Sequence, residues 1–169
     1  MIYSLNLSHG IDLRVLAPEH WQVVANAKAK EVVKLDSLQG FENLVNKEKD
    51  ADEGQAELTF KLHTFESCPP ISTYIYNVCA GEYDVIVNDD ASAPVPMKIF
   101  LRNSKINNID AKELFRVVSC GIRFFEKFIG VKYPFEKYDQ IFCPEYRIGA
   151  MENVGAITFN DNFLQPKDA

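Results

Sequence analysis

Five consecutive residues near the end of the chain combine small side chains with one carboxylate: Gly149, Ala150, Met151, Glu152 and Asn153. Because Gly149 and Ala150 have little or no side chain, another backbone can approach them and pair as an added strand. The carboxylate of Glu152 can then meet a cation. Opposite charges about 4 Å apart attract by about 4 kcal/mol at an effective dielectric of about 20, before desolvation. Composition alone also fits a glycine-led turn between two strands, with Glu152 and Asn153 exposed.

In order, these five residues match the exopeptidase motif of the aminopeptidase N family of zinc metallopeptidases, the GAMEN-motif aminopeptidases, which the chain resembles. A fixed pentapeptide arises by chance in about one chain of this length in twenty thousand. The flanking segments also resemble the family, at residues 133–140, 144–146 and 154–159. Weaker similarity to its first domain lies at residues 17–21, 24–26 and 71–74. The resemblance covers nearly the whole chain and is specific over residues 132–160.

The resemblance implies that the pentapeptide binds substrate. Glu152 is expected to anchor the α-ammonium group of a peptide with a free N-terminus. The backbone of Gly149 and Ala150 is expected to hydrogen-bond the peptide, and Met151 to line the pocket for its first side chain. Asn153 completes the expected set. Because a related branch that also hydrolyses a lipid epoxide has glycine at the position of Ala150, this residue favours a plain aminopeptidase.

Zinc is the cofactor that the resemblance implies for the whole enzyme, because the reaction needs a Lewis acid with an open coordination position. The family takes its ligands from a His-Glu-x-x-His pattern and a later Glu. The three histidines of this chain, His9, His20 and His63, lie too far apart for paired ligands on one helix face. We therefore expect no metal ligand and no complete catalytic site in this chain, and no activity from it alone.

Two functions remain open at this point. In the first, the chain is a fragment of a zinc aminopeptidase that releases N-terminal amino acids from peptides, ending before the zinc-binding helix. A His-Glu-x-x-His pattern encoded beyond Ala169 would distinguish it. In the second, the chain is a non-catalytic module that binds peptide N-termini through Glu152, which requires peptide binding that is lost in Glu152→Ala.

The overall composition narrows the class of protein. The chain has 169 residues, 47% hydrophobic and 25% charged, which is typical of a globular domain. Its net charge of −6 argues against nucleic acid or anionic membrane as a partner. It contains no apolar run of roughly 18 residues, so we expect no transmembrane segment. Four dispersed cysteines indicate reduced thiols and favour a cytoplasmic location.

The elements that must position the pentapeptide fall into two regions. Residues 1–105 are β-rich, with alternating apolar residues over 11–16, 56–62 and 97–101 and a Tyr/Ile/Val-rich stretch over 73–87 that Gly81 bends. This pattern predicts an antiparallel saddle or sandwich, the C-terminal part of an N-terminal β domain. A polar run over 39–55 predicts a solvated loop.

After residue 106 the apolar residues no longer alternate but recur at helical spacing, so the chain as a whole, with residues 106–169 included, is predicted to be mixed α+β. Apolar residues recur every three to four positions over 110–129, which predicts a helix buried along its apolar face. Asp110 with Glu113 resembles a capping box, and Gly130 ends the helix. Strands follow at 138–143 and 155–159. The family resemblance implies that this region starts a thermolysin-like catalytic domain, truncated before the zinc site.

Overall fold

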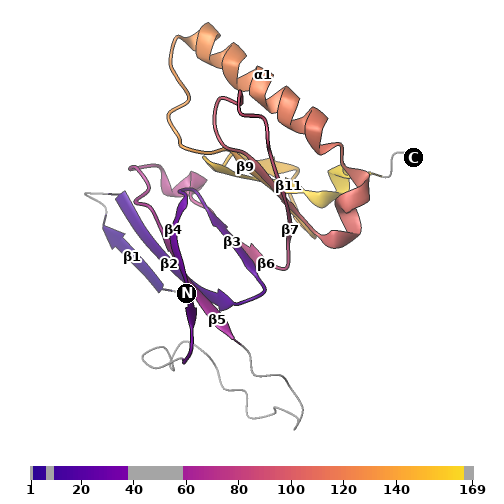
Figure 1. Ribbon diagram of the computed structural model, residues 1–169. Helices are drawn as coiled ribbons and strands as arrows, with labels where there is room; N and C mark the ends of the chain where they lie inside the picture. Colours follow the sequence, from indigo (N-terminus) through magenta and orange to yellow (C-terminus); the bar gives the residue numbers. More distant parts are fainter. Residues whose placement is uncertain (1, 7–9, 38–58, 166–169) are drawn as a thin grey trace.

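The computed structural model describes residues 2–6, 10–37 and 59–165 (Figure 1). The first sheet is antiparallel and has the strand order β1-β2-β5-β4. Its strands are β1 (Ile2–Asn6), β2 (Gly10–Pro18), β4 (Ala29–Leu35) and β5 (Phe60–Phe65). The alternation predicted over 11–16 lies inside β2. The polar run over 39–55 lies outside the described residues.

The second sheet is mixed and has the order β10-β11-β9-β8-β7. It comprises β7 (Asp84–Val87), β8 (Lys98–Leu101), β9 (Asp139–Cys143), β10 (Ala150–Met151) and β11 (Ala156–Asn160). The three central strands run parallel, and the outer strands β7 and β10 are antiparallel to their neighbours. Between the parallel strands β8 and β9 the chain forms α1 (Ala111–Ile129).

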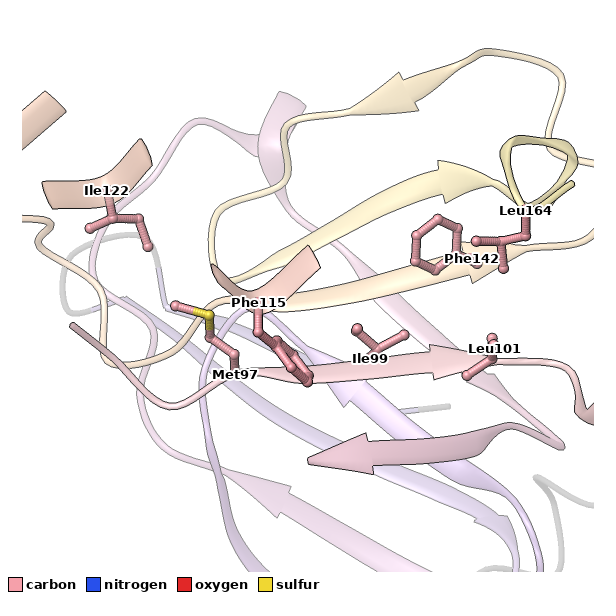
Figure 2. Packing of buried hydrophobic residues seen from close by; sticks show 7 residues of the cluster. All are labelled: Met97, Ile99, Leu101, Phe115, Ile122, Phe142 and Leu164. Carbon is pink, nitrogen blue, oxygen red and sulfur yellow. The ribbon is translucent and has the colours of Figure 1, made fainter. Parts of the chain in front are cut away.

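Alternation along β8 sends its side chains to two different layers. Ile99 and Leu101 are fully buried with Phe115 and Ile122 of α1 on one face (Figure 2). Phe100 is buried on the opposite face in a second cluster with Val24. Val24 belongs to a ribbon of β3 (Gln22–Ala25) and β6 (Val78–Gly81). The five-stranded sheet therefore lies between α1 and this ribbon.

The ends of α1 follow the local sequence signals. The carboxylate of Asp110 accepts a hydrogen bond from the backbone N–H of Glu113 at 3.1 Å, as a helix N-cap does. The Glu113 side chain binds Arg116 on the next turn, so the reciprocal half of a capping box is replaced by an ion pair. Gly130 ends the helix in the left-handed conformation with φ of 77°.

The prediction that α1 is buried along its whole apolar face is wrong for its C-terminal half. Phe124 and Phe128 are 60% and 76% exposed and stack on each other on the side away from the sheet. Phe125 and Ile129 continue the sheet-facing stripe one to two turns past Ile122, yet they are also more than half exposed. Helical periodicity identified the apolar residues, but it could not show how far the sheet extends beneath them.

The mixed character predicted for the fold is confirmed, with an antiparallel β-rich part and a long helix. The bend predicted at Gly81 separates β6 from β7, and the strands predicted at 138–143 and 155–159 correspond to β9 and β11. The division between residues 105 and 106 stays a prediction, and the five-stranded sheet takes strands from both sides of it. None of the helices in the described part of the chain has the length and apolar character that a membrane crossing needs.

Gly155 lies where the ribbon meets the five-stranded sheet, and its position requires glycine. Its φ is +70°, and a Cβ built on it would lie 2.4 Å from the backbone oxygen of Asn26. A left-handed residue with a side chain is strained, and the clash would push β3 away from β11.

We predict that Gly155→Ala lowers the free energy of unfolding by about 2–4 kcal/mol, measured by urea denaturation. The matched control is Gly121→Ala in α1, where a Cβ meets nothing within 4 Å. This control should raise the unfolding free energy by about 0.5–1 kcal/mol, because alanine favours the helix. Equal effects of the two substitutions would contradict the close approach at Gly155.

Candidate functional site

The pentapeptide, here called the 149–153 strip, contains an edge strand of the five-stranded sheet. Ala150 and Met151 form β10 and pair with Phe159 and Thr158 of β11. Among the described strands, β10 has a neighbour on one side only. Its outer edge therefore presents backbone groups to which an extended peptide can add as a further strand. Exposure of Gly149 and Ala150 keeps this edge accessible.

Glu152 follows this edge strand directly and lies at the surface. The Tyr74 hydroxyl donates a hydrogen bond to its Oε1 at 3.1 Å. Tyr74 comes from the 3₁₀ turn η2 (Thr73–Ile75) and is 65% exposed. The hydrogen bond to Glu152 and the negative charge of its carboxylate raise the pKa of Tyr74, so the hydroxyl stays a donor at neutral pH. Glu152 thus presents an exposed carboxylate beside β10, and Tyr74 holds that carboxylate by a hydrogen bond.

The buried carboxamide of Asn26 brings η2 to the strip. Its Nδ2 donates to the backbone oxygens of Ile75 at 3.0 Å and Val154 at 2.8 Å. Its Oδ1 accepts from the backbone N–H of Asn77 at 2.8 Å. One side chain therefore fixes the turn that carries Tyr74 to the segment that follows Glu152. Asn26 and Tyr74 lie in stretches that resemble the family, but no residue pattern in the sequence predicted a role for either.

Asn77 adds a second connection between the same two layers. Its Nδ2 donates to the backbone oxygen of Ala156 in β11 at 3.0 Å. The two asparagines lie at the end of β3 and just before β6, so the ribbon holds the five-stranded sheet through both. A buried amide without hydrogen-bond partners costs about 1–3 kcal/mol of stability. These hydrogen bonds therefore favour one placement of the ribbon on the five-stranded sheet.

Asn153 is buried, unlike Glu152 beside it. Its Nδ2 donates to Thr158 Oγ1 at 3.1 Å, and the same hydroxyl bonds the Tyr146 hydroxyl at 2.9 Å. Its backbone oxygen accepts from Ala156 N at 3.1 Å. The Asn153 side chain thus closes the turn between β10 and β11, and its expected contact with substrate stays a prediction.

The start of the strip is held by Asn160, the last residue of β11. The backbone N–H of Asn160 donates to the Gly149 oxygen at 2.8 Å, and its side chain bonds the Tyr146 oxygen. A Cβ on Gly149 would lie 3.3 Å from the ring of Phe163, which is 62% exposed. Glycine at position 149 therefore lets this aromatic ring lie against the strip.

A buried ion pair holds the backbone just after the strip, at Gly155. Lys137 Nζ lies 2.8 Å from Asp139 Oδ2 and donates to the Gly155 backbone oxygen at 2.6 Å. Both side chains are less than a tenth exposed. Burial lowers the pKa of Lys137, against the opposing attraction of Asp139. Because the pair and the Gly155 oxygen satisfy each other, the removal of one partner would leave a buried group unpaired.

The described residues contain no group of three His, Cys, Asp or Glu side chains that could hold a metal ion. His20 is at the surface with its Nε2 3.0 Å from Glu82, and His63 is buried in β5. His9 lies outside the described residues. The described residues therefore offer no set of side chains that fits zinc, and they place the exposed Glu152 carboxylate next to the edge strand β10.

Comparisons with known proteins agree with the family that the sequence resembles. Residues 97–168 match the model of the peptidase family M1 domain. The chain is 32% identical over 152 residues to aminopeptidase N of Streptomyces lividans and 26% identical over 147 residues to aminopeptidase 2 of Candida albicans. It is also 34% identical over 100 residues to human aminopeptidase N.

These alignments cover 89%, 87% and 59% of this chain, respectively. They cover only 15%, 13% and 10% of the three relatives, so the chain spans a small part of their length.

We predict that Lys137→Met lowers the free energy of unfolding by about 3–5 kcal/mol, because Asp139 would remain buried without its partner. Denaturation in urea measures the change. Replacement of both partners, Lys137→Met with Asp139→Asn, should recover more than half of the loss. The matched control is Lys132→Met, which removes an 88% exposed lysine from Glu126, whose carboxylate keeps its hydrogen bond from the Tyr133 N–H. Its effect should stay within about 0.5 kcal/mol, and a loss as large as that of Lys137→Met would refute the argument.

Proposed function

Because the chain belongs to the aminopeptidase N family, we propose that its 149–153 strip binds the free amino terminus of a peptide. The whole protein then releases N-terminal amino acids from peptides with the help of zinc. The observation that carries the proposal is the exposed carboxylate of Glu152 beside the open edge of β10, held by the Tyr74 hydroxyl. In this proposal the described residues bind substrate, and zinc is bound elsewhere in the whole protein.

The proposed binding mode combines a strand pairing with a charge pairing. A peptide lying along β10 places backbone groups against Ala150 and Met151, while its α-ammonium meets Glu152. An internal amide has no positive charge to offer, so the carboxylate favours a chain terminus. Met151 is half-buried at the same edge and contacts the first side chain of the peptide.

Exposure of Glu152 to water limits the affinity of this chain for a peptide. At 4 Å, opposite charges attract by about 1 kcal/mol in bulk water, compared with about 4 kcal/mol in a partly desolvated site. Because Glu152 is exposed, the smaller value applies. We therefore expect binding in the millimolar range, where an ammonium group improves affinity by about fivefold.

The thermolysin-like nature of the region from residue 106 onwards and a cytoplasmic location are further proposals. The first is supported by the match of residues 97–168 to the peptidase family M1 domain. The second is supported by the four cysteines, which are all free thiols in the structure.

We predict that a dialanine amide with a free amino group binds about five times more tightly than its N-acetylated form, as measured by calorimetric titration. Glu152→Gln should abolish this difference, because the neutral amide no longer attracts the ammonium. Glu145→Gln removes a nearby exposed carboxylate and is the control that should keep it. If Glu152→Gln retained the full preference for the free amine, the proposed anchor would be wrong.

We further predict that Tyr74→Phe weakens binding of the same free-amine peptide by about threefold, because Glu152 loses the donor that holds its Oε1. The N-acetylated peptide should be affected less, since it does not use the carboxylate. A matched control is Tyr83→Phe, whose hydroxyl lies near Cys143 and not at Glu152. Unchanged binding in Tyr74→Phe would remove Tyr74 from the site.

A further inference from the structure

Two cysteines on different elements face the same interior space between the ribbon and the five-stranded sheet. Cys79 lies opposite Val24 in the β3–β6 pairing, so both side chains are on one face of the ribbon. Cys143 is two residues from Ile141 on β9, and residues two apart share a face of a strand. Val24 and Ile141 belong to one buried cluster, against which both cysteines pack half-buried.

The polar groups around the two sulfurs favour thiol chemistry at Cys79. Each thiol is the largest influence on the pKa of the other. Asn77 Nδ2 lies 3.4 Å from Cys79 Sγ and can donate to its thiolate. The pKa of Cys79 is lowered by these contacts against the effect of burial, whereas that of Cys143 is raised. Cys79 is therefore the thiol that ionises first.

The hydroxyl of Tyr83 is a polar group beside Cys143. Tyr83 donates to Cys143 Sγ at 3.9 Å, and burial raises the pKa of Tyr83 above its ordinary value, so it remains a donor. The other two cysteines are placed differently. Cys68 is buried near β2, and Cys120 is exposed on α1, so neither belongs to this cluster.

We propose that Cys79 and Cys143 form a modification site, a dithiol that a small-molecule disulfide oxidises to an intramolecular disulfide between β6 and β9. The site is independent of the proposed peptide binding. It joins the same two layers that Asn26 and Asn77 join by hydrogen bonds.

The oxidation is a pair of thiol–disulfide exchanges with glutathione disulfide as the oxidant. The Cys79 thiolate attacks one sulfur of the oxidant, a protein–glutathione bond forms, and the oxidant's S–S bond breaks to release one glutathione thiolate. Cys143, having lost its proton to solvent, then attacks the Cys79 sulfur and releases the second glutathione. The protein loses two electrons and two protons, and the oxidant becomes two molecules of glutathione.

The reduced chain of residues 1–169, incubated with glutathione disulfide, tests the proposal. We expect the Cys68→Ser/Cys120→Ser variant to lose about 2 Da, bind no iodoacetamide, stay monomeric and melt at a higher temperature, since a crosslink constrains the unfolded chain. In the chain with all four cysteines, proteolytic mapping should find a peptide that joins Cys79 to Cys143, so the test does not depend on the variant folding.

The single substitution Cys143→Ser should stop the reaction at a glutathione adduct on Cys79. Persistence of two alkylatable thiols in the Cys68→Ser/Cys120→Ser variant would overturn the proposal. So would a mapped crosslink that joins Cys79 or Cys143 to Cys68 or Cys120 in preference to each other.

Discussion

The candidate site depends on the hydrogen bonds of one buried side chain, the carboxamide of Asn26. The oxygen and both nitrogen-bound hydrogens of this carboxamide join three segments that are distant in sequence: the end of β3, the turn η2 with the residue after it, and Val154 after the strip. A buried amide is tolerated only when its hydrogen bonds are made, so the three segments can meet in few other ways. The meeting of Tyr74 with Glu152, 78 residues apart, follows from this junction.

The two layers also constrain each other at the backbone. Gly155 approaches the Asn26 oxygen too closely for a side chain, and Lys137 donates a hydrogen bond to the Gly155 oxygen. The strip is thereby anchored at its C-terminal end through Val154 and Gly155 and at its start through Asn160. Between these anchors β10 remains an exposed edge. A rigid base with an open edge is the arrangement that strand addition by a peptide requires.

Local signals in the sequence predicted local structure well. The Asp110 cap, the Gly130 end of α1 and the alternating strand in β2 each depend on a few neighbouring residues, and all were found. The strip was singled out because its five adjacent residues match a family motif. The parallel pairing of β8 with β9 joins strands on either side of α1, and no periodicity encodes it. The exposure of Phe124 and Phe128 likewise depends on how the helix sits on the sheet.

Binding of a peptide amino terminus at the strip is tested most directly by an NMR titration of the isotope-labelled chain with a free-amine dialanine amide and with its N-acetylated form. With the free-amine peptide we expect saturable shifts of the backbone amides of Ala150 and Met151 and of the Glu152 carboxyl carbon. With the acetylated peptide we expect clearly smaller shifts. Equal shifts for both peptides, or shifts confined to the exposed aromatic side chains of α1, would contradict this binding mode.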